Sequence, residues 1–143
     1  MTTEKGVILV VYKESRGHRR FLVLKRTKNW EGWELPKGHL EDGYESTVRL
    51  ELEEEAGIEE SEIVEVEEMG ETVSWSFEDD GEEIHREYRA FLVRVDGDAI
   101  VDVSGNPHDE HDSGYFFNYD DVHSLLTYDD QRSLLREAKE TLE

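Results

Sequence analysis

The sequence predicts one α/β domain, residues 1–143, in which helices cover both faces of a mixed β-sheet. Apolar or alternating runs typical of strands occupy the first half and the middle of the chain, and helix-like segments lie between and after them. A hydrophobic fraction of 36%, with 3 Trp, 6 Tyr and 5 Phe, supplies enough apolar side chains for a core. No linker, repeat or low-complexity stretch divides the chain.

Two kinds of pattern indicate the strands. Gly6–Tyr12 is a continuous apolar run typical of a buried strand, and the alternation at Val73, Trp75 and Phe77 is typical of a strand with one buried face. Turns at residues 14–20 and 78–81 are expected to join neighbouring strands. In chain order, the expected strands cover residues 6–12, 21–26, 61–77, 82–95 and 115–119.

Helices are expected in three places. The first spans Ser46–Ala56 and ends at Gly57, because glycine readily takes the left-handed conformation that terminates a helix. A short helix near Asp120–Leu126 and a longer one from Asp129 follow. Residues 29–45 lack periodicity and are expected to form a loop. The last helix should turn four apolar side chains inward: Leu134, Leu135, Ala138 and Leu142.

The charge of the chain is extreme, with 37 acidic against 16 basic residues and a net charge of −21. Such a surface repels nucleic acids and anionic membranes, so neither DNA nor a membrane is an expected partner. The acid excess suits a very salty cytoplasm, where a Debye length of about 3 Å would screen self-repulsion. An acidic protein from an ordinary cytoplasm remains the alternative to a halophilic one.

Cysteine usage and the N-terminus exclude further classes. The chain has no Cys, which rules out disulfides, thiolate catalysis and Cys-based zinc sites. The apolar run Val7–Val11 is too short for a signal peptide or a membrane span. A cytoplasmic location is therefore expected.

Basic residues concentrate in one segment. Between Arg16 and His39 there are seven Lys or Arg, opposed by Glu31 and Glu34 alone, which gives a local charge of +5. This segment is interpreted as a patch that receives a small polyanion, unless the clustering is chance in a highly charged chain.

The expected first helix carries a stripe of carboxylates beside its apolar face. Glu51, Glu54 and Glu55 follow one another around the helix, next to Val48, Leu52 and Ala56, and no Lys or Arg lies within the stripe. Like charges at these spacings destabilise a helix by a few tenths of a kcal/mol per pair, about 0.2–0.5. Carboxylate oxygens at the edge of a buried face suit hard cations such as Mg²⁺ or Mn²⁺. A solvated acidic helix is the alternative.

This segment resembles the Nudix box. In "GHLEDGYESTVRLELEEEAGI", the second half matches the pattern at Glu51, Leu52, the pair Glu54–Glu55 and the pair Gly57–Ile58. The first half departs from it. The spacing from Gly38 to Glu51 is two residues short.

The two residues that brace the box in the family are displaced in this chain. Leu50 stands at the arginine position and Tyr44 at the first glutamate position. We expect another brace here, either Tyr44 packed on Leu50 or an ion pair between Glu45 and Arg49.

Other segments, above all "WELPKGH" at 33–39, resemble the asymmetric diadenosine tetraphosphate hydrolases of the Nudix family. The resemblance implies the Nudix α/β/α sandwich and a hydrolase that uses Mg²⁺ or Mn²⁺ to cleave a nucleoside diphosphate-linked substrate. Diadenosine tetraphosphate, cut to ATP and AMP, is the expected substrate. ADP-ribose, oxidised nucleotides, RNA 5′ ends and a non-catalytic nucleotide sensor are the alternatives. A monomer or homodimer is expected.

The resemblance also implies roles for particular residues. The general base is expected to be Glu54, with Glu51 and Glu110 as alternatives. Tyr88 is expected to stack on a base, Tyr115 less so, while Trp75, Phe77 and Phe116 are assigned to the core. His111 is expected to be a surface residue. The expected metal ligands are the Gly38 carbonyl, Glu51, Glu54, Glu55 and Glu110, and the expected phosphate contacts are Lys37, His39 and Arg26.

Overall fold

A mixed β-sheet forms the centre of the computed structural model, which describes residues 1–105 and 111–143. The main path of the sheet runs β3-β2-β1-β6-β5, with β4 paired to β1 and β7 paired to β2. β1 and β6 are parallel, and the other pairs are antiparallel. The described strands are β1 (Thr2–Ser15), β2 (His18–Arg26), β3 (Gly32–Glu34), β4 (Lys37–His39), β5 (Ile63–Asp79), β6 (Glu82–Val95) and β7 (His111–Phe117).

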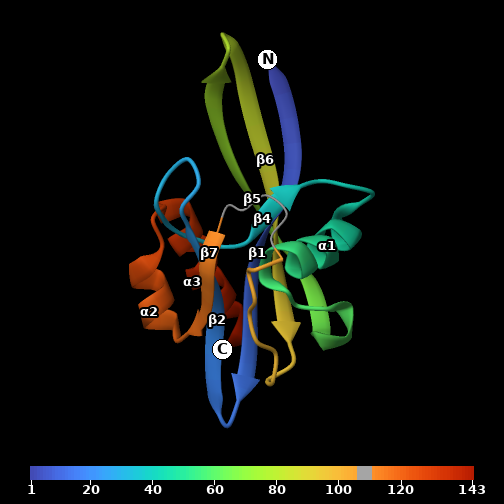
Figure 1. Ribbon diagram of the computed structural model, residues 1–143, viewed down its shortest axis with the longest axis vertical. Helices are drawn as coiled ribbons and strands as arrows, with labels where there is room; N and C mark the ends of the chain where they lie inside the picture. Colours follow the sequence, from blue (N-terminus) through green and yellow to red (C-terminus); the bar gives the residue numbers. More distant parts are fainter. Residues whose placement is uncertain (106–110) are drawn as a thin grey trace.

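Helices lie on both sides of this sheet, as Figure 1 shows. α1 (Tyr44–Ala56) covers one face, and α2 (Tyr119–Leu125) and α3 (Asp129–Leu142) cover the other. A single 3₁₀ turn, Glu60–Glu62, follows α1. The arrangement is the α/β/α sandwich that the sequence predicts. None of the described helices combines the length and the apolar character needed to cross a membrane.

The central strand β1 explains why the sheet has two cores. Val7, Leu9 and Val11 pack toward α1, whereas Ile8 and Val10 pack toward α2 and α3. Successive side chains of a strand point to opposite faces, so a strand covered on both sides is apolar throughout. The continuous run in the sequence is therefore buried on both faces.

The β5–β6 hairpin extends beyond the body of the sheet (Figure 1). Its turn is formed by Asp80 and Gly81, both at positive φ, within the predicted turn at 78–81. β1 follows this extension, because its residues Thr2–Tyr12 pair in parallel with Ile84–Arg94 of β6. The hairpin forms one side of the pocket described below.

Four expectations need correction. The turn expected at residues 14–20 is limited to Arg16 and Gly17, because residues 14–15 and 18–20 pair between β1 and β2. Residues 29–45 contain the strands β3 and β4, which are too short to show a period and exist because they pair with β2 and β1. β7 begins at His111 rather than Tyr115, because polar residues continue its pairing with β2. α1 begins at Tyr44, two residues early, and ends as predicted at Gly57 with φ 66°.

Candidate functional site

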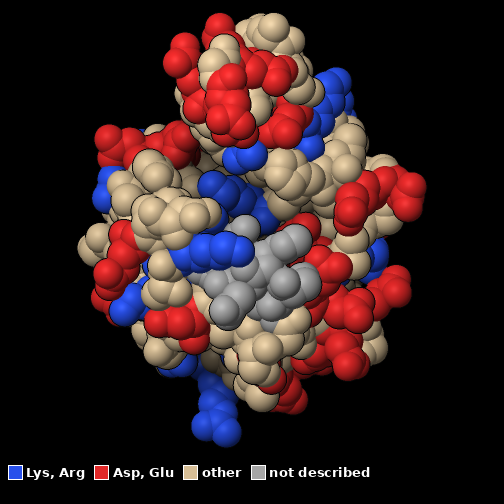
Figure 2. Space-filling view, turned by 45° about the horizontal axis from the view of Figure 1, so that its top comes forward, with Lys and Arg blue, Asp and Glu red and all other residues tan. Residues whose placement is uncertain are grey.

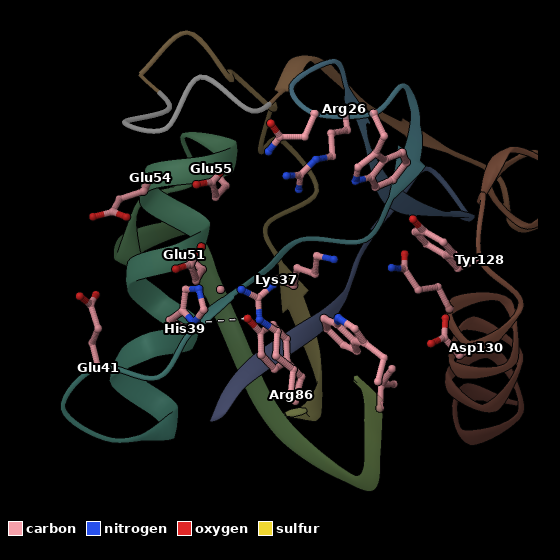
Figure 3. A pocket seen from close by; sticks show the side chains of 17 residues that line it. Arg26, Lys37, His39, Glu41, Glu51, Glu54, Glu55, Arg86, Tyr128 and Asp130 are labelled. Atoms are coloured by element: carbon pink, nitrogen blue, oxygen red, sulfur yellow. Dashed lines mark hydrogen bonds between the residues drawn. The ribbon is translucent and has the colours of Figure 1, made fainter. Parts of the chain in front are cut away.

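One large cavity, of about 900 Å³, opens between α1, β4, the β5–β6 hairpin and the start of α3. Figure 3 shows Glu41, Glu51, Glu54 and Glu55 along the α1 side, with Arg26, Lys37 and Arg86 in the middle and Tyr128 and Asp130 opposite. The remaining residues that line it are Asn29, Trp30, Gly38, His39, Val73, Trp75, Tyr88 and Gln131.

The acidic wall follows from how α1 packs. Val48, Leu52 and Ala56 are fully buried against the sheet, so the next stripe of the helix lies at the edge of the core. Glu51 and Glu55 are accordingly buried, and Glu54 is half-buried. The helix thus turns its carboxylates into the cavity.

Gly38 allows α1 to approach β4 closely. A Cβ atom at this position would lie 2.0 Å from Oε1 of Glu51, so any other residue would force the carboxylate or the strand to move. The Glu51 carboxylate therefore lies directly against the backbone of Gly38. Only glycine permits this contact, which brings a carboxylate and a peptide unit together at the cavity wall.

The donor atoms on this wall fit a hard divalent cation. Glu51, Glu54 and Glu55 offer only oxygen, the ligand that Mg²⁺ and Mn²⁺ prefer. Within residues 1–105 and 111–143, no three acidic or histidine side chains already converge on one point. A bound ion would therefore draw these carboxylates together.

Glu55 contacts a buried histidine. Oε2 of Glu55 lies 3.2 Å from Nδ1 of His111, and Nε2 of His111 lies 2.8 Å from Oε1 of Glu34. Burial alone would lower the pKa of His111, but the hydrogen bonds to both carboxylates outweigh it and raise the pKa from 6.5 to about 9. His111 is therefore an imidazolium that donates from both ring nitrogens. The expectation of a surface histidine is wrong.

Glu34 is the second member of this buried group. Its Oε1 pairs with Nη1 of Arg26 at 3.2 Å, and its Oε2 faces Nζ of Lys37 at 3.5 Å. Burial alone would raise the pKa of Glu34, but the His111 hydrogen bond and the charges of Lys37, His111 and Arg26 outweigh it and lower the pKa. Glu34 thus stays a carboxylate that holds two pocket cations in place.

A third cation comes from the hairpin. Arg86, on β6, lines the cavity and pairs through Nε with Glu4 of β1 at 2.8 Å. Its guanidinium also lies over the ring of Phe77, 4.7 Å from the centroid. Arg26, Lys37 and Arg86 give the middle of the cavity a positive charge opposite the acidic wall.

Aromatic side chains lie at two places in the cavity. Trp75 and Tyr88 pack edge to face at 5.0 Å, with Nζ of Lys37 5.0 Å from the Trp75 ring. Trp30 and Tyr128 form a similar pair at 5.3 Å. The cavity thus has one aromatic pair from the hairpin and a second from the loops before β3 and α3.

All the predicted site residues that the structure describes line this one cavity: Gly38, Glu51, Glu54, Glu55, Arg26, Lys37, His39 and Tyr88. Glu110 lies outside the described residues. Tyr88 is buried, with its hydroxyl 3.5 Å from Nδ1 of His39. Trp75 packs on the core, as expected, but also lines the cavity. Tyr115 is exposed and stacks on Phe117 instead.

The predicted basic patch is divided in the structure. Arg26 and Lys37 line the main cavity, whereas Arg16 and Arg20 lie at a smaller hollow near the β1–β2 turn. Arg19 pairs with Glu14 at 3.2 Å. A β-hairpin separates residues that are close in sequence, so the segment does not form one surface.

Sequence reasoning missed Trp30, Arg86, Tyr128, Glu34 and His111. Arg86 precedes Tyr88 by two residues on one strand, so its place on the same face was a usable signal. The two aromatic residues lie in loops far apart in sequence. Glu34 and His111 give no local pattern at all, because a polar side chain is recognised as buried only once its partners are known.

The shortened box is braced by an ion pair. Nη2 of Arg49 lies 3.0 Å from Oε1 of Glu45, the second of the two expected arrangements, and Nη1 lies 3.5 Å from Glu60. Tyr44 stacks on Phe91 with ring centroids 6.3 Å apart, and the Arg89 guanidinium lies over the Tyr44 ring, 4.2 Å from its centroid. The first turn of α1 is thus tied to the rest of its helix and to β6.

Many solved structures share this fold, among them the three that follow. A Caenorhabditis elegans Ap4A hydrolase in a binary complex has a TM-score of 0.75 at 23% identity, covering 97% of each chain. The NUDIX domain of Shewanella oneidensis NrtR complexed with ADP ribose scores 0.76 at 17% identity, covering 100% of this chain and 90% of that one. The Escherichia coli dihydroneopterin triphosphate pyrophosphohydrolase scores 0.73 at 15%, covering 96% and 97%.

Sequence comparison gives the family directly. No curated protein matches the chain significantly. The family model described as the NUDIX domain matches residues 2–138, nearly the whole length. Together with the α/β/α sandwich and the carboxylate wall of α1, this match shows that the chain belongs to the Nudix family of pyrophosphohydrolases.

Proposed function

We propose that the protein is a Mg²⁺- or Mn²⁺-dependent hydrolase that cleaves diadenosine tetraphosphate asymmetrically into ATP and AMP. The carrying observation is that the carboxylates of α1 face Arg26, Lys37 and Arg86 across one cavity of about 900 Å³. Cations bind phosphate oxygens, and carboxylates hold metal and accept protons. The phosphoanhydride bridge of the substrate would lie between the pocket cations and the α1 carboxylates.

The proposed roles follow from position. Glu51, Glu54, Glu55 and the Gly38 carbonyl would hold the divalent ion, which supplies charge neutralisation at the phosphate oxygens and lowers the pKa of water. Water then adds to one phosphorus, the bond from that phosphorus to the bridging oxygen breaks, and the leaving phosphate carries that oxygen away. Glu54, half-buried on the wall, takes the proton of the water.

The two aromatic pairs support a substrate with two nucleosides. Trp75–Tyr88 and Trp30–Tyr128 lie in the same cavity as Lys37 and its neighbouring cations. Bases stack on aromatic rings with little regard to sequence. The cavity volume also lies near the upper end of the range of about 300–1,000 Å³ for ligand sites. A base at each pair would leave the polyphosphate among the cations.

The basic middle of the cavity reconciles this substrate with the overall charge. In Figure 2, Lys and Arg side chains gather near the centre of the face shown, while Asp and Glu dominate around them. A small polyanion would be attracted locally by the three pocket cations. A long nucleic acid would also meet the acidic surroundings, so DNA is not a proposed partner.

ADP-ribose is the second candidate, because the NrtR domain of similar fold is complexed with it. Oxidised nucleotides and RNA 5′ ends are further substrate candidates, and a sensor would bind a nucleotide without turnover. The α1 carboxylates favour an enzyme, since a pure binder has no need of them. The expectation of a cytoplasmic monomer or homodimer stays a prediction.

Product analysis tests the proposal. The protein is incubated with diadenosine tetraphosphate, ADP-ribose, oxidised dGTP and 5′-diphosphorylated RNA, with Mg²⁺, with Mn²⁺ or with EDTA, and the products are separated by chromatography. Equal amounts of ATP and AMP that appear only with metal support the proposal. Turnover of another substrate alone contradicts the proposed substrate, and tight binding without any product indicates a sensor.

A further inference from the structure

Two charged residues lie behind the cavity rather than in its wall. The side chains of Glu34, on β3, and His111, at the start of β7, are only 1% and 3% exposed. Neither belongs to the described lining. Yet Glu34 contacts Arg26 and Lys37, and His111 contacts Glu55, all three of which line the cavity. This buried pair joins the cationic middle to the acidic wall.

Stability alone does not account for such a pair. Taking ions out of water is costly, and replacing a buried ion pair with apolar residues of similar volume is often neutral or stabilising. The geometry, in contrast, determines orientation. His111 has a carboxylate at each ring nitrogen, at 2.8 Å and 3.2 Å, so the ring is fixed at both ends. Because the imidazole of His111 cannot rotate freely, it restricts the orientation of the Glu55 carboxylate that it contacts.

Glu55 needs such a contact. It shares its helix stripe with Glu51 and Glu54, so three carboxylates repel one another at the cavity edge. His111 holds Glu55 through Oε2, 3.2 Å from its Nδ1, inside the wall. Hydrogen-bond partners of metal-binding carboxylates orient the ligands, and losing one costs about 10- to 100-fold in metal affinity or activity.

We propose that His111, held in place by Glu34, is a positioning residue that orients the Glu55 carboxylate toward a divalent cation. The inference rests on the proposed function in one respect, that the α1 carboxylates bind metal. His111 acts through Glu55 and is not itself a ligand. Its effect must therefore depend on which ring nitrogen is replaced and on whether residue 55 can bind a cation.

Two substitutions separate the ring nitrogens. The amide nitrogen of Asn occupies roughly the place of Nδ1, which faces Glu55, whereas that of Gln reaches the place of Nε2, which faces Glu34. Calorimetry with MnCl₂, without nucleotide, should show about 10-fold weaker binding for His111→Gln. His111→Asn should retain most of the affinity. A merely structural role would lower the melting temperature of both variants and leave their Mn²⁺ affinities alike.

A double-mutant cycle tests whether His111 acts through Glu55. In a Glu55→Gln background, His111→Gln should cause no further loss of Mn²⁺ affinity, because the residue it orients no longer carries the charge. His123→Gln is the matched control, since this histidine lies on α2 outside the cavity. It should bind Mn²⁺ like the wild type.

The outcomes that contradict the inference are specific. Unchanged Mn²⁺ affinity in His111→Gln, or an equal loss in the Glu55→Gln background, overturns it. If both His111 variants unfold, Glu34→Gln replaces them, with a smaller loss expected and an unchanged affinity overturning the inference. Wild-type protein that binds Mn²⁺ but releases no ATP and AMP overturns the proposed substrate alone. Wild-type protein that binds no Mn²⁺ overturns both.

Discussion

Neighbouring glutamates on α1 offer a test at the scale of single residues. Glu54 lines the cavity and is half-buried, whereas Glu53 is exposed and lies outside it. If Glu54 accepts the proton of the attacking water, Glu54→Gln should lower kcat by about 10²- to 10⁴-fold and leave the melting temperature nearly unchanged. Release of AMP from diadenosine tetraphosphate gives kcat.

Glu53→Gln is the control for this experiment, because it removes the same charge from the same helix turn. It should keep the wild-type kcat. An unchanged kcat in Glu54→Gln would assign the base elsewhere, and Glu51→Gln would then be the next variant to measure.

The close contact at Gly38 leads to a second prediction. A Cβ atom would lie 2.0 Å from the Glu51 carboxylate, so Gly38→Ala must displace that side chain or the strand. All the atoms in the way lie at the end of the Glu51 side chain, so the loss of stability should be small, whereas a displaced Glu51 should clearly weaken Mn²⁺ binding. Melting curves and Mn²⁺ calorimetry measure the two effects.

Gly105→Ala is the matched substitution, because no atom lies within 4 Å of a Cβ built there. Both its stability and its Mn²⁺ affinity should equal those of the wild type. If Gly38→Ala lowers the melting temperature but binds Mn²⁺ normally, Glu51 is not one of the ligands.

At the scale of elements, long periodic segments were predictable and short paired ones were not. The alternation of residues 82–95 gave β6 with its observed bounds. On α3, Leu134, Leu135 and Ala138 are buried as expected, and Leu142 is partly buried against the same core. β3 and β4 have three residues each and owe their existence to pairing with β2 and β1. No local pattern indicates such pairing, because it depends on the tertiary arrangement.

The cavity likewise combines residues that a local pattern predicts with residues that only the tertiary arrangement brings together. The α1 carboxylates and the strand 37–39 come from one continuous motif, so the sequence places them together. Trp30, Arg86 and Tyr128 come from three separate segments, two loops and β6, that meet only when the sheet forms. His111 was misjudged for another reason. An isolated histidine is usually exposed, and only the carboxylates of Glu34 and Glu55 make its burial favourable.

The ion pair that stands in for the family's brace lies within α1. Because Arg49 already pairs with Glu45 at 3.0 Å, an arginine at position 50 would find no unpaired Glu45. Leu50→Arg should therefore not raise the melting temperature. A clear rise would show that the arrangement typical of the family is still the better one here.

Arg49→Gln, the companion variant, removes the observed pair. Both partners are substantially exposed, with side-chain exposures of 32% and 68%, so the loss should be small. Such helix pairs contribute about 0.3–0.5 kcal/mol to the free energy of unfolding. Urea denaturation of the two variants and the wild type measures these differences, and a loss above about 1 kcal/mol would mean that the pair does more than an exposed helix pair.

At the scale of the whole molecule, the net charge of −21 makes stability depend on salt. Mutual repulsion of surface carboxylates destabilises the compact state, and salt shortens its range from about 30 Å at 0.01 M to about 3 Å at 1 M. The melting temperature should therefore rise steadily from 0.01 to 1 M KCl. Chloride is preferable to sulfate, which strengthens apolar burial by itself.

A charge-reduced variant separates screening from other effects of salt. Glu65, Glu67 and Glu71 are exposed on β5, outside the cavity, and their replacement by Gln changes the net charge from −21 to −18. This variant should melt at a higher temperature than the wild type in 0.01 M KCl, because less repulsion remains to be screened. The difference should shrink toward 1 M. Parallel curves for the two proteins would show that salt acts on stability by another route, and the acid excess would then have no screening-dependent role in stability.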